Sequence, residues 1–164
     1  MIELKPTDDQ LLQAIKMGQE MGTLRNSISG GSGNTAGFLG EILTAEYLKA
    51  DHKNTYQYDL ILSNGKTIDV KTKRCRSVPK PEYDVSIASY NTKQDTDYYV
   101  FTRTKGDYST VWILGYIEKE LYFKQATERK KGDRDPTNGF LFRADCWNLA
   151  IGDLKNIDDL KLKE

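Results

Sequence analysis

The chain lacks the features that mark membrane, secreted and metal-thiolate proteins. No apolar run approaches the length of a transmembrane helix. The first five residues, MIELK, lack the basic and then apolar pattern of a signal peptide, so we expect a cytoplasmic protein. The two cysteines, Cys75 and Cys146, lack metal-site spacing, and we expect no disulfide in that compartment. What remains is a globular chain of 164 residues, which favours a single domain over residues 1–164.

The chain also lacks net charge, since 24 Lys and Arg residues balance 24 Asp and Glu residues. This balance removes the global basic character typical of many nucleic-acid-binding proteins. The charges are nevertheless unevenly placed. Residues 71–80, KTKRCRSVPK, contain five cations and no acid, and residues 124–134 are basic on balance. Such runs are either a solvated face or a surface for an anionic partner.

The pattern of apolar residues predicts helices first and strands afterwards. Residues 22–35 between the first two helices are rich in Gly, Ser and Asn, and we expect a flexible loop there, either a strap over a substrate or a linker. No Gly-Lys-Ser/Thr follows, which excludes a phosphate-binding P-loop. This order predicts an α/β or α+β fold with a central mixed β-sheet flanked by helices. The predicted helices are 7–21, 36–50 and 118–126; the predicted strands are the hairpin 58–73, then 84–90, 98–104, 109–117 and a short strand near 139–143, with a loop at 127–138.

The hairpin at residues 58–73, YDLILSNGKTIDVKTK, has a register that its sequence can decide. Asn64-Gly65 is a strong turn signal. A two-residue loop would oppose apolar to charged residues along both strands. A three-residue loop with Gly65 in the left-handed bulge position places Leu60 opposite Ile68 and keeps one face apolar. We therefore predict the three-residue loop.

The predicted register brings two acids together, with Asp59 opposite Asp69 and Lys71 two residues further along. Opposed residues have Cβ atoms roughly 4.5–5.5 Å apart, and like charges there are destabilising. A bound Mg²⁺ or Mn²⁺ would offset the repulsion, because these hard cations take oxygen ligands. Alternatively, the acids belong to a solvated face that Lys71 and Lys73 neutralise. The pattern alone leaves both interpretations open.

The helix predicted before this hairpin carries two glutamates within its broad apolar face. Glu41 lies near Gly37 and Gly40, which weaken a helix and so indicate close packing of another backbone. Glu46 lies nearer the centre of the apolar face. An unpaired buried carboxylate is costly, so each glutamate needs a partner or a water-filled niche. The helical wheel does not choose between them.

The order of these residues resembles the PD-(D/E)xK nuclease superfamily, most of all its phage and Holliday-junction-resolvase-like branches. GFLGE, YD and IDVK match the helix glutamate, the strand aspartate and the acid-x-lysine tripeptide, within residues 36–104. The chain departs from the family at Tyr58, where proline is common, and at Asp69, where glutamate is more frequent. The resemblance implies a restriction-endonuclease-like core.

The resemblance also implies a role for each matching residue. Asp59 and Asp69 would bind Mg²⁺ or Mn²⁺ together with the carbonyl oxygen of Val70. Glu41, matched by its GxxGE context, would hold the metal or its water shell. Lys71 would orient or help to deprotonate the attacking water, or stabilise charge on the phosphate. A bound metal suits phosphodiester hydrolysis because it makes water nucleophilic near neutral pH and clamps developing charge.

The basic run acquires a function in this context. Lys73, Arg74 and Arg76 follow directly from the predicted catalytic strand. We expect them to contact DNA phosphates, which sets affinity without reading sequence. The polar stretch 91–94 is a second candidate lining of the same groove, unless it forms a capped turn.

Two functions are consistent with these motifs. The first is a magnesium-dependent DNA endonuclease, with branched or recombination-intermediate DNA as candidate substrate; a homodimer would match a symmetric substrate. The second is a catalytically inactive module of the same fold that binds nucleic acid or a protein. The complete set of acids and the lysine favours the enzyme, because an inactive relative is expected to have lost one of them.

Overall fold

The computed structural model describes residues 1–22, 33–53 and 55–161. It is a mixed α/β structure, as the sequence predicts. The helices are α1 (Asp8–Met21), α2 (Asn34–Leu48) and α3 (Lys119–Gln125), with 3₁₀ turns η1 (Ser89–Asn91), η2 (Ile151–Asp153) and η3 (Ile157–Leu160). The strands are β1 (Ile2–Leu4), β2 (Asp51–His52), β3 (Leu60–Ile61), β4 (Thr67–Cys75), β5 (Asp84–Ala88), β6 (Tyr98–Lys105), β7 (Val111–Glu118), β8 (Thr127–Arg129) and β9 (Cys146–Ala150).

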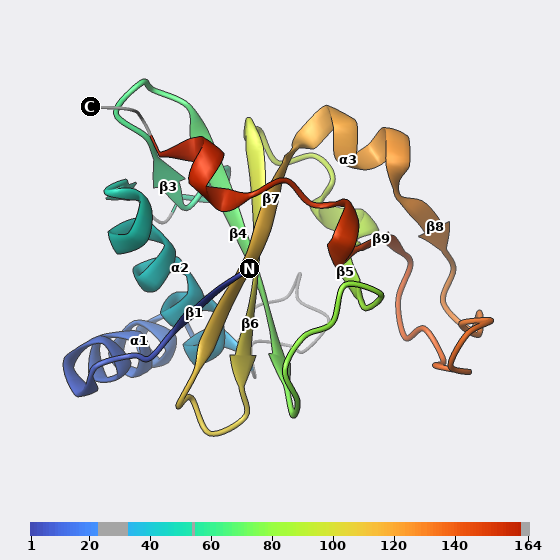
Figure 1. Ribbon diagram of the computed structural model, residues 1–164, viewed down its shortest axis with the longest axis horizontal. Coiled ribbons are helices and arrows are strands. Elements are labelled where there is room, and N and C mark those ends of the chain that lie inside the picture. Colours follow the sequence, from blue (N-terminus) through green and yellow to red (C-terminus); the bar gives the residue numbers. More distant parts are fainter. Residues whose placement is uncertain (23–32, 54, 162–164) are drawn as a thin grey trace.

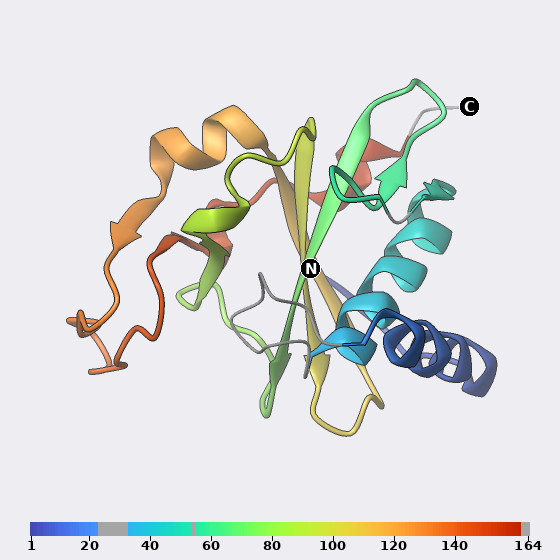
Figure 2. The same ribbon diagram turned by 180° about the vertical axis from the view of Figure 1, so that it is seen from behind.

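The main sheet has six strands in the order β1-β7-β6-β4-β3-β2. Strands β4 and β6 run parallel and every other neighbouring pair in it is antiparallel, so the sheet is mixed, as predicted. A second, antiparallel sheet has the order β5-β9-β8. Helices α1 and α2 lie on one side of the main sheet, whereas the second sheet and α3 lie on the other (Figures 1 and 2).

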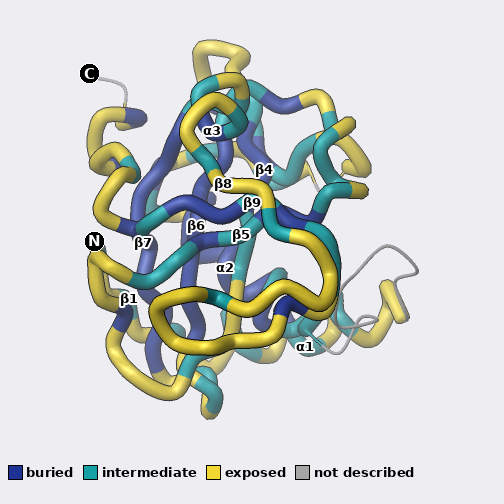
Figure 3. Tube along the Cα trace, turned by 90° about the vertical axis from the view of Figure 1, so that its right-hand side faces the viewer, coloured by how far each residue is buried: buried dark blue, intermediate teal, exposed yellow. Residues whose placement is uncertain are grey.

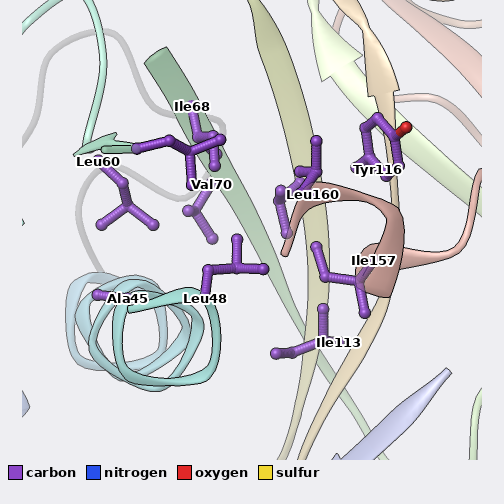
Figure 4. Close-up of a cluster of buried hydrophobic side chains, with 11 residues drawn as sticks. Ala45, Leu48, Leu60, Ile68, Val70, Ile113, Tyr116, Ile157 and Leu160 are labelled. Carbon is purple, nitrogen blue, oxygen red and sulfur yellow. The ribbon is translucent and has the colours of Figure 1, made fainter. Parts of the chain in front are cut away.

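The main sheet is buried on both faces. On β6, Val100 joins the core beneath α2, and Tyr99 and Phe101 join the core beneath the second sheet. Figure 4 shows Ala45 and Leu48 of α2 in the first of these cores. In Figure 3 the strands β6 and β7 are mostly buried, whereas the loop between β8 and β9 is mostly exposed. Side chains of β4 therefore face different surroundings on alternate residues.

The predicted helices form with small changes at their ends. Thr7 caps α1: its Oγ1 accepts from the Gln10 N–H at 3.2 Å, and Gln10 Oε1 accepts from the Thr7 N–H at 2.8 Å. Helix α2 begins at Asn34, so the last two residues of the loop predicted at 22–35 are helical. Residues 23–32 of that loop lie outside the described part of the chain. No helix in the described part of the chain has the length and apolar character needed to cross a bilayer.

The prediction fails in the last third of the chain. The expected strand near 139–143 is wrong: these residues form a loop in which Leu141 makes one isolated bridge to Arg134. The ring of Phe140 is exposed there rather than packed. The strand is instead β9, which begins seven residues after the predicted start, and the segment predicted as a loop at 127–138 contains β8. The short strands β1 and β2 were not predicted.

Candidate active site

The hairpin adopts the predicted register next to its turn, but the predicted pair of Asp59 directly opposite Asp69 does not form, because β3 spans only Leu60–Ile61. Leu60 pairs with Ile68, and the Leu62 N–H donates to the Lys66 carbonyl at 2.8 Å. Gly65 has a φ of +82° and donates its N–H to the Leu62 carbonyl at 2.8 Å. Glycine is favoured at this turn because a left-handed backbone is costly for residues with a Cβ. The three-residue loop is therefore confirmed.

Asp59 lies just outside the regular ladder, because β3 begins at Leu60. Its N–H donates to the Ile68 carbonyl at 2.9 Å, and its Oδ2 accepts from the Val70 N–H at 2.7 Å. The Asp59 carboxylate thus accepts the hydrogen bond from β4 that the backbone carbonyl of a further β3 residue would otherwise accept. The N–H and C=O of one strand residue point to the same side, so the Val70 carbonyl faces this edge as well. The edge is where the hairpin strands separate.

Asp69 and Lys71 extend from the face of β4 that looks away from α2. Val70 packs in the core with α2, and its neighbours on either side must point to the opposite face. Lys71 Nζ lies 2.6 Å from Asp69 Oδ2 and donates to Gln94 Oε1 at 3.0 Å. Asp69 Oδ2 is buried and accepts no hydrogen bond of good geometry from any described residue. Gln94, the last residue of the polar stretch 91–94, therefore reaches Lys71, while the start of the stretch forms a turn in which the Thr92 hydroxyl donates to the Ser89 carbonyl.

The structure separates the two helix glutamates that the wheel left equal. Glu41 is 8 % exposed, and its Oε2 lies 2.7 Å from Nε2 of His52. Glu46 is exposed and accepts from the Gln10 side chain. Glu41 is thus the helix carboxylate of the site.

Gly40 explains how α2 comes close enough to the sheet. A Cβ at this position would overlap Thr72 Oγ1 and lie 2.6 Å from Thr102 Oγ1, on β4 and β6. The absence of a side chain therefore lets the helix backbone rest on the two strands. Glu41, the next residue, extends from this contact towards the β4 edge.

The carboxyl groups of Glu41, Asp59 and Asp69 are close enough to interact electrostatically. Burial, followed by the charge of Asp69, raises the pKa of Glu41 from 4.5 to about 8, although Lys71 opposes the shift. Burial, followed by Glu41 and Asp69, raises the pKa of Asp59 well above its usual value, while the Val70 N–H and Lys71 oppose this shift. Burial also lowers the pKa of His52, against the attraction of Asp59. One lysine does not balance three acids at this site.

The donor atoms suit a hard divalent cation. Carboxylate and carbonyl oxygens are the ligands that Mg²⁺ and Mn²⁺ prefer, and a bound cation would oppose both the burial and the mutual repulsion that raise these pKa values. Within residues 1–22, 33–53 and 55–161, however, no three His, Cys, Asp or Glu side chains are arranged so that they could hold one ion. A metal would have to draw the carboxylates closer together.

The predicted phosphate contacts separate onto different surfaces. Lys73 shares the face of Lys71, two residues along β4. Arg74 extends from the other face, where its Nη2 donates to the Gly106 carbonyl at 2.8 Å. Arg76 is exposed beyond the end of β4. The three cations therefore do not form one continuous surface beside Lys71.

Sequence reasoning missed His52 and Arg103. His52 is the single histidine of the chain, and no motif surrounds it. It reaches the site because β2 pairs it with Leu60, the neighbour of Asp59. Arg103 lies directly opposite Lys73 in the parallel pair of β4 and β6. That pairing joins segments about thirty residues apart, which no local pattern reveals.

No family model and no curated protein match this chain. The resemblance to the PD-(D/E)xK superfamily therefore rests on the order of the motif residues.

Proposed function

We propose that the chain is a Mg²⁺- or Mn²⁺-dependent DNA endonuclease with a restriction-endonuclease-like core, related to the phage and Holliday-junction-resolvase-like branches. One observation carries the proposal: Glu41, Asp59 and Asp69 come from three separate segments and act on one another electrostatically beside Lys71. Carboxyl groups whose pKa values are raised by burial and by neighbouring acids are typical of functional sites. Their order in the chain is also the order in the superfamily.

The proposed roles follow from the positions. Asp59, Asp69 and the Val70 carbonyl would hold the ion at the β4 edge, and Glu41 would hold it or its water shell from α2. The ion, when bound, would lower the pKa of a water molecule and stabilise negative charge on the phosphate. Lys71 is held by Asp69 and Gln94 and can donate to the attacking water or to a phosphate oxygen.

DNA as substrate, a cytoplasmic location and a homodimer on symmetric substrates belong to the same proposal. Branched or recombination-intermediate DNA remains the candidate substrate class.

The second candidate is a catalytically inactive module of the same fold that binds nucleic acid or a protein. It is favoured by the absence, in the described residues, of three side chains already arranged around one ion. In that case Lys71 would neutralise Asp69 permanently, and the paired acids would have a structural role.

Cleavage assays separate the two candidates. Purified protein is incubated with Mg²⁺ or Mn²⁺ and with linear, circular, single-stranded and four-way-junction DNA, and a chelator serves as the negative control. We expect Asp59→Asn, Asp69→Asn and Lys71→Gln to reduce cleavage by at least about 100-fold. Glu46→Gln is the matched control for Glu41→Gln, because it removes an exposed charge from the same helix. Absence of cleavage by the wild type on every substrate would refute the enzyme, and cleavage unaffected by the three site substitutions would refute the proposed active site.

A further inference from the structure

Beyond Lys71, the same face of the main sheet brings together Lys73 of β4 and Arg103 of β6, and no described acid forms an ion pair with either. Lys73 stands directly opposite Arg103 of β6. Like charges at such positions destabilise a sheet. Neither cation has a carboxylate within ion-pairing distance among the described residues, and Asp84 is the acid that acts on both from further away. Although Lys73 as a whole residue is exposed, the surrounding protein partly removes its ammonium group from water, and this effect, followed by Arg103, lowers the pKa of Lys73.

Arg103 is held in place rather than free to move into solvent. It is 8 % exposed, and its Nη2 donates to the Asp84 carbonyl at 2.7 Å. A guanidinium has five N–H donors, so this contact leaves others available. Lys71, Lys73, Ser86 and Arg103 line a small open pocket between the main sheet and β5. The pocket therefore offers fixed positive charge and hydrogen-bond donors to an anion, next to the candidate active site.

An exposed aromatic ring lies beside this pocket. Phe140 belongs to the loop between β8 and β9, is 52 % exposed, and has its ring centroid 5.9 Å from Lys73 Nζ. Phe142 supports the ring edge-on, with centroids 5.4 Å apart. Aromatic rings next to cations are the usual platform for unpaired bases, which stack on the ring while their phosphates contact the cations.

We infer that Lys73, Arg103 and Phe140 form a binding site for one unpaired nucleotide of a DNA strand, with the phosphate in the pocket and the base against the ring. The inference rests on the proposed function and specifies its substrate: the strand must be single or locally unpaired next to the cleaved bond. A base inside an intact duplex could not stack on Phe140, because both of its faces are already covered.

The test measures binding in a chelator, where cleavage does not occur. Fluorescence anisotropy of labelled oligothymidine and of a duplex of equal length gives the dissociation constants of the full chain. We expect Phe140→Ala to weaken single-strand binding by about 5- to 150-fold. Lys73→Gln should make the slope of log affinity against log salt less negative by about 0.7, which is the value for one phosphate contact on a single strand. Inorganic phosphate should compete weakly for the same site.

Matched controls keep the test specific. Leu141→Ala removes a neighbouring exposed apolar side chain without removing a ring, and Lys16→Gln removes an exposed lysine from α1, on the other side of the main sheet. Neither should change binding. Arg103→Gln removes a buried cation, so its binding is measured only if thermal unfolding shows that the variant folds. Lys73→Gln and Phe140→Ala change exposed side chains and test the inference without it.

Equal binding of single strand and duplex, or wild-type affinity in both Lys73→Gln and Phe140→Ala, would overturn the inference. Its failure is distinct from failure of the proposed function. A protein that cuts DNA but ignores these substitutions refutes the nucleotide site alone. A protein that binds as expected but never cuts refutes the nuclease and leaves the binding site standing.

Discussion

Replacing Glu41 with glutamine should stabilise the protein at alkaline pH while leaving its stability in acid almost unchanged. The carboxyl group has a pKa of about 8 in the folded protein and 4.5 in its ordinary state, because burial and Asp69 disfavour its charge. Between these values the folded state binds more protons than the unfolded state. The wild type is therefore fully stabilised below pH 4.5 and loses stability as the pH rises towards 8.

The size of the effect follows from the same pKa values. A difference from 4.5 to about 8, at 1.36 kcal/mol per unit, gives an upper limit of about 5 kcal/mol, of which about 4 kcal/mol is lost by pH 8. Glutamine keeps the shape and a hydrogen-bonding partner for His52 but cannot ionise. The variant should therefore be more stable than the wild type at pH 8, by an amount that disappears towards pH 4.5.

Urea unfolding followed by circular dichroism, at several pH values from 4.5 to 8 and in a chelator, measures this difference directly. Glu46→Gln is the control and should follow the wild type at every pH, because Glu46 is exposed. Stability profiles of Glu41→Gln and the wild type that run parallel over this pH range would show that the pKa of Glu41 is not raised in the folded protein.

Two further predictions concern glycines that place the site. Gly40→Ala should destabilise the protein by about 1–3 kcal/mol and reduce any cleavage, because its Cβ would push α2 and Glu41 away from the sheet. Gly37→Ala is the matched variant, because its Cβ would meet nothing within 4 Å. It should stabilise the protein by up to about 1 kcal/mol in thermal unfolding. Gly65→Ala should cost about 1–2 kcal/mol and Gly65→Asn less, since asparagine tolerates the left-handed backbone better. Equal melting temperatures within either pair would contradict the corresponding prediction.

The hairpin shows what a sequence can predict well. Its register depends on local information alone: a glycine turn and the alternation of apolar residues such as Leu60 and Ile68. The exact setting of Asp59 was less predictable. Whether Asp59 belongs to the ladder depends on where β3 begins, and β3 begins after Asp59, whose carboxylate accepts a hydrogen bond from the Val70 N–H.

The choice between Glu41 and Glu46 needed tertiary structure. A helical wheel treats the apolar face as uniform, but α2 meets β4 at Gly40 and meets α1 elsewhere. Glu46 therefore turns towards Gln10, whereas Glu41 turns towards the sheet edge. Gly40 was the useful signal, because the sheet approaches the helix backbone closely there; the expectation of close packing at Gly37 was wrong, since an added Cβ would meet nothing within 4 Å.

The second sheet was the least predictable part. The run GFLFR has the composition of a strand, yet tertiary context leaves Phe140 on the surface. Strand β9 contains Asn148, a poor strand former, and forms because β5 and β8 pair with it on both sides. Arg103 could not be recognised without the parallel pairing of β4 and β6.

The most direct test of the central claim is the binding of Mn²⁺ by isothermal titration calorimetry at pH 6 and pH 8. If the acids at the β4 edge hold the ion, the wild type should bind it more tightly at pH 8 than at pH 6. Binding should also release protons, because carboxyl groups with raised pKa values must lose their protons before they can bind the ion. Asp59→Asn should abolish binding, whereas the exposed Asp51→Asn should not affect it. Absence of Mn²⁺ binding by the wild type at either pH, or unchanged binding by Asp59→Asn, would contradict the account.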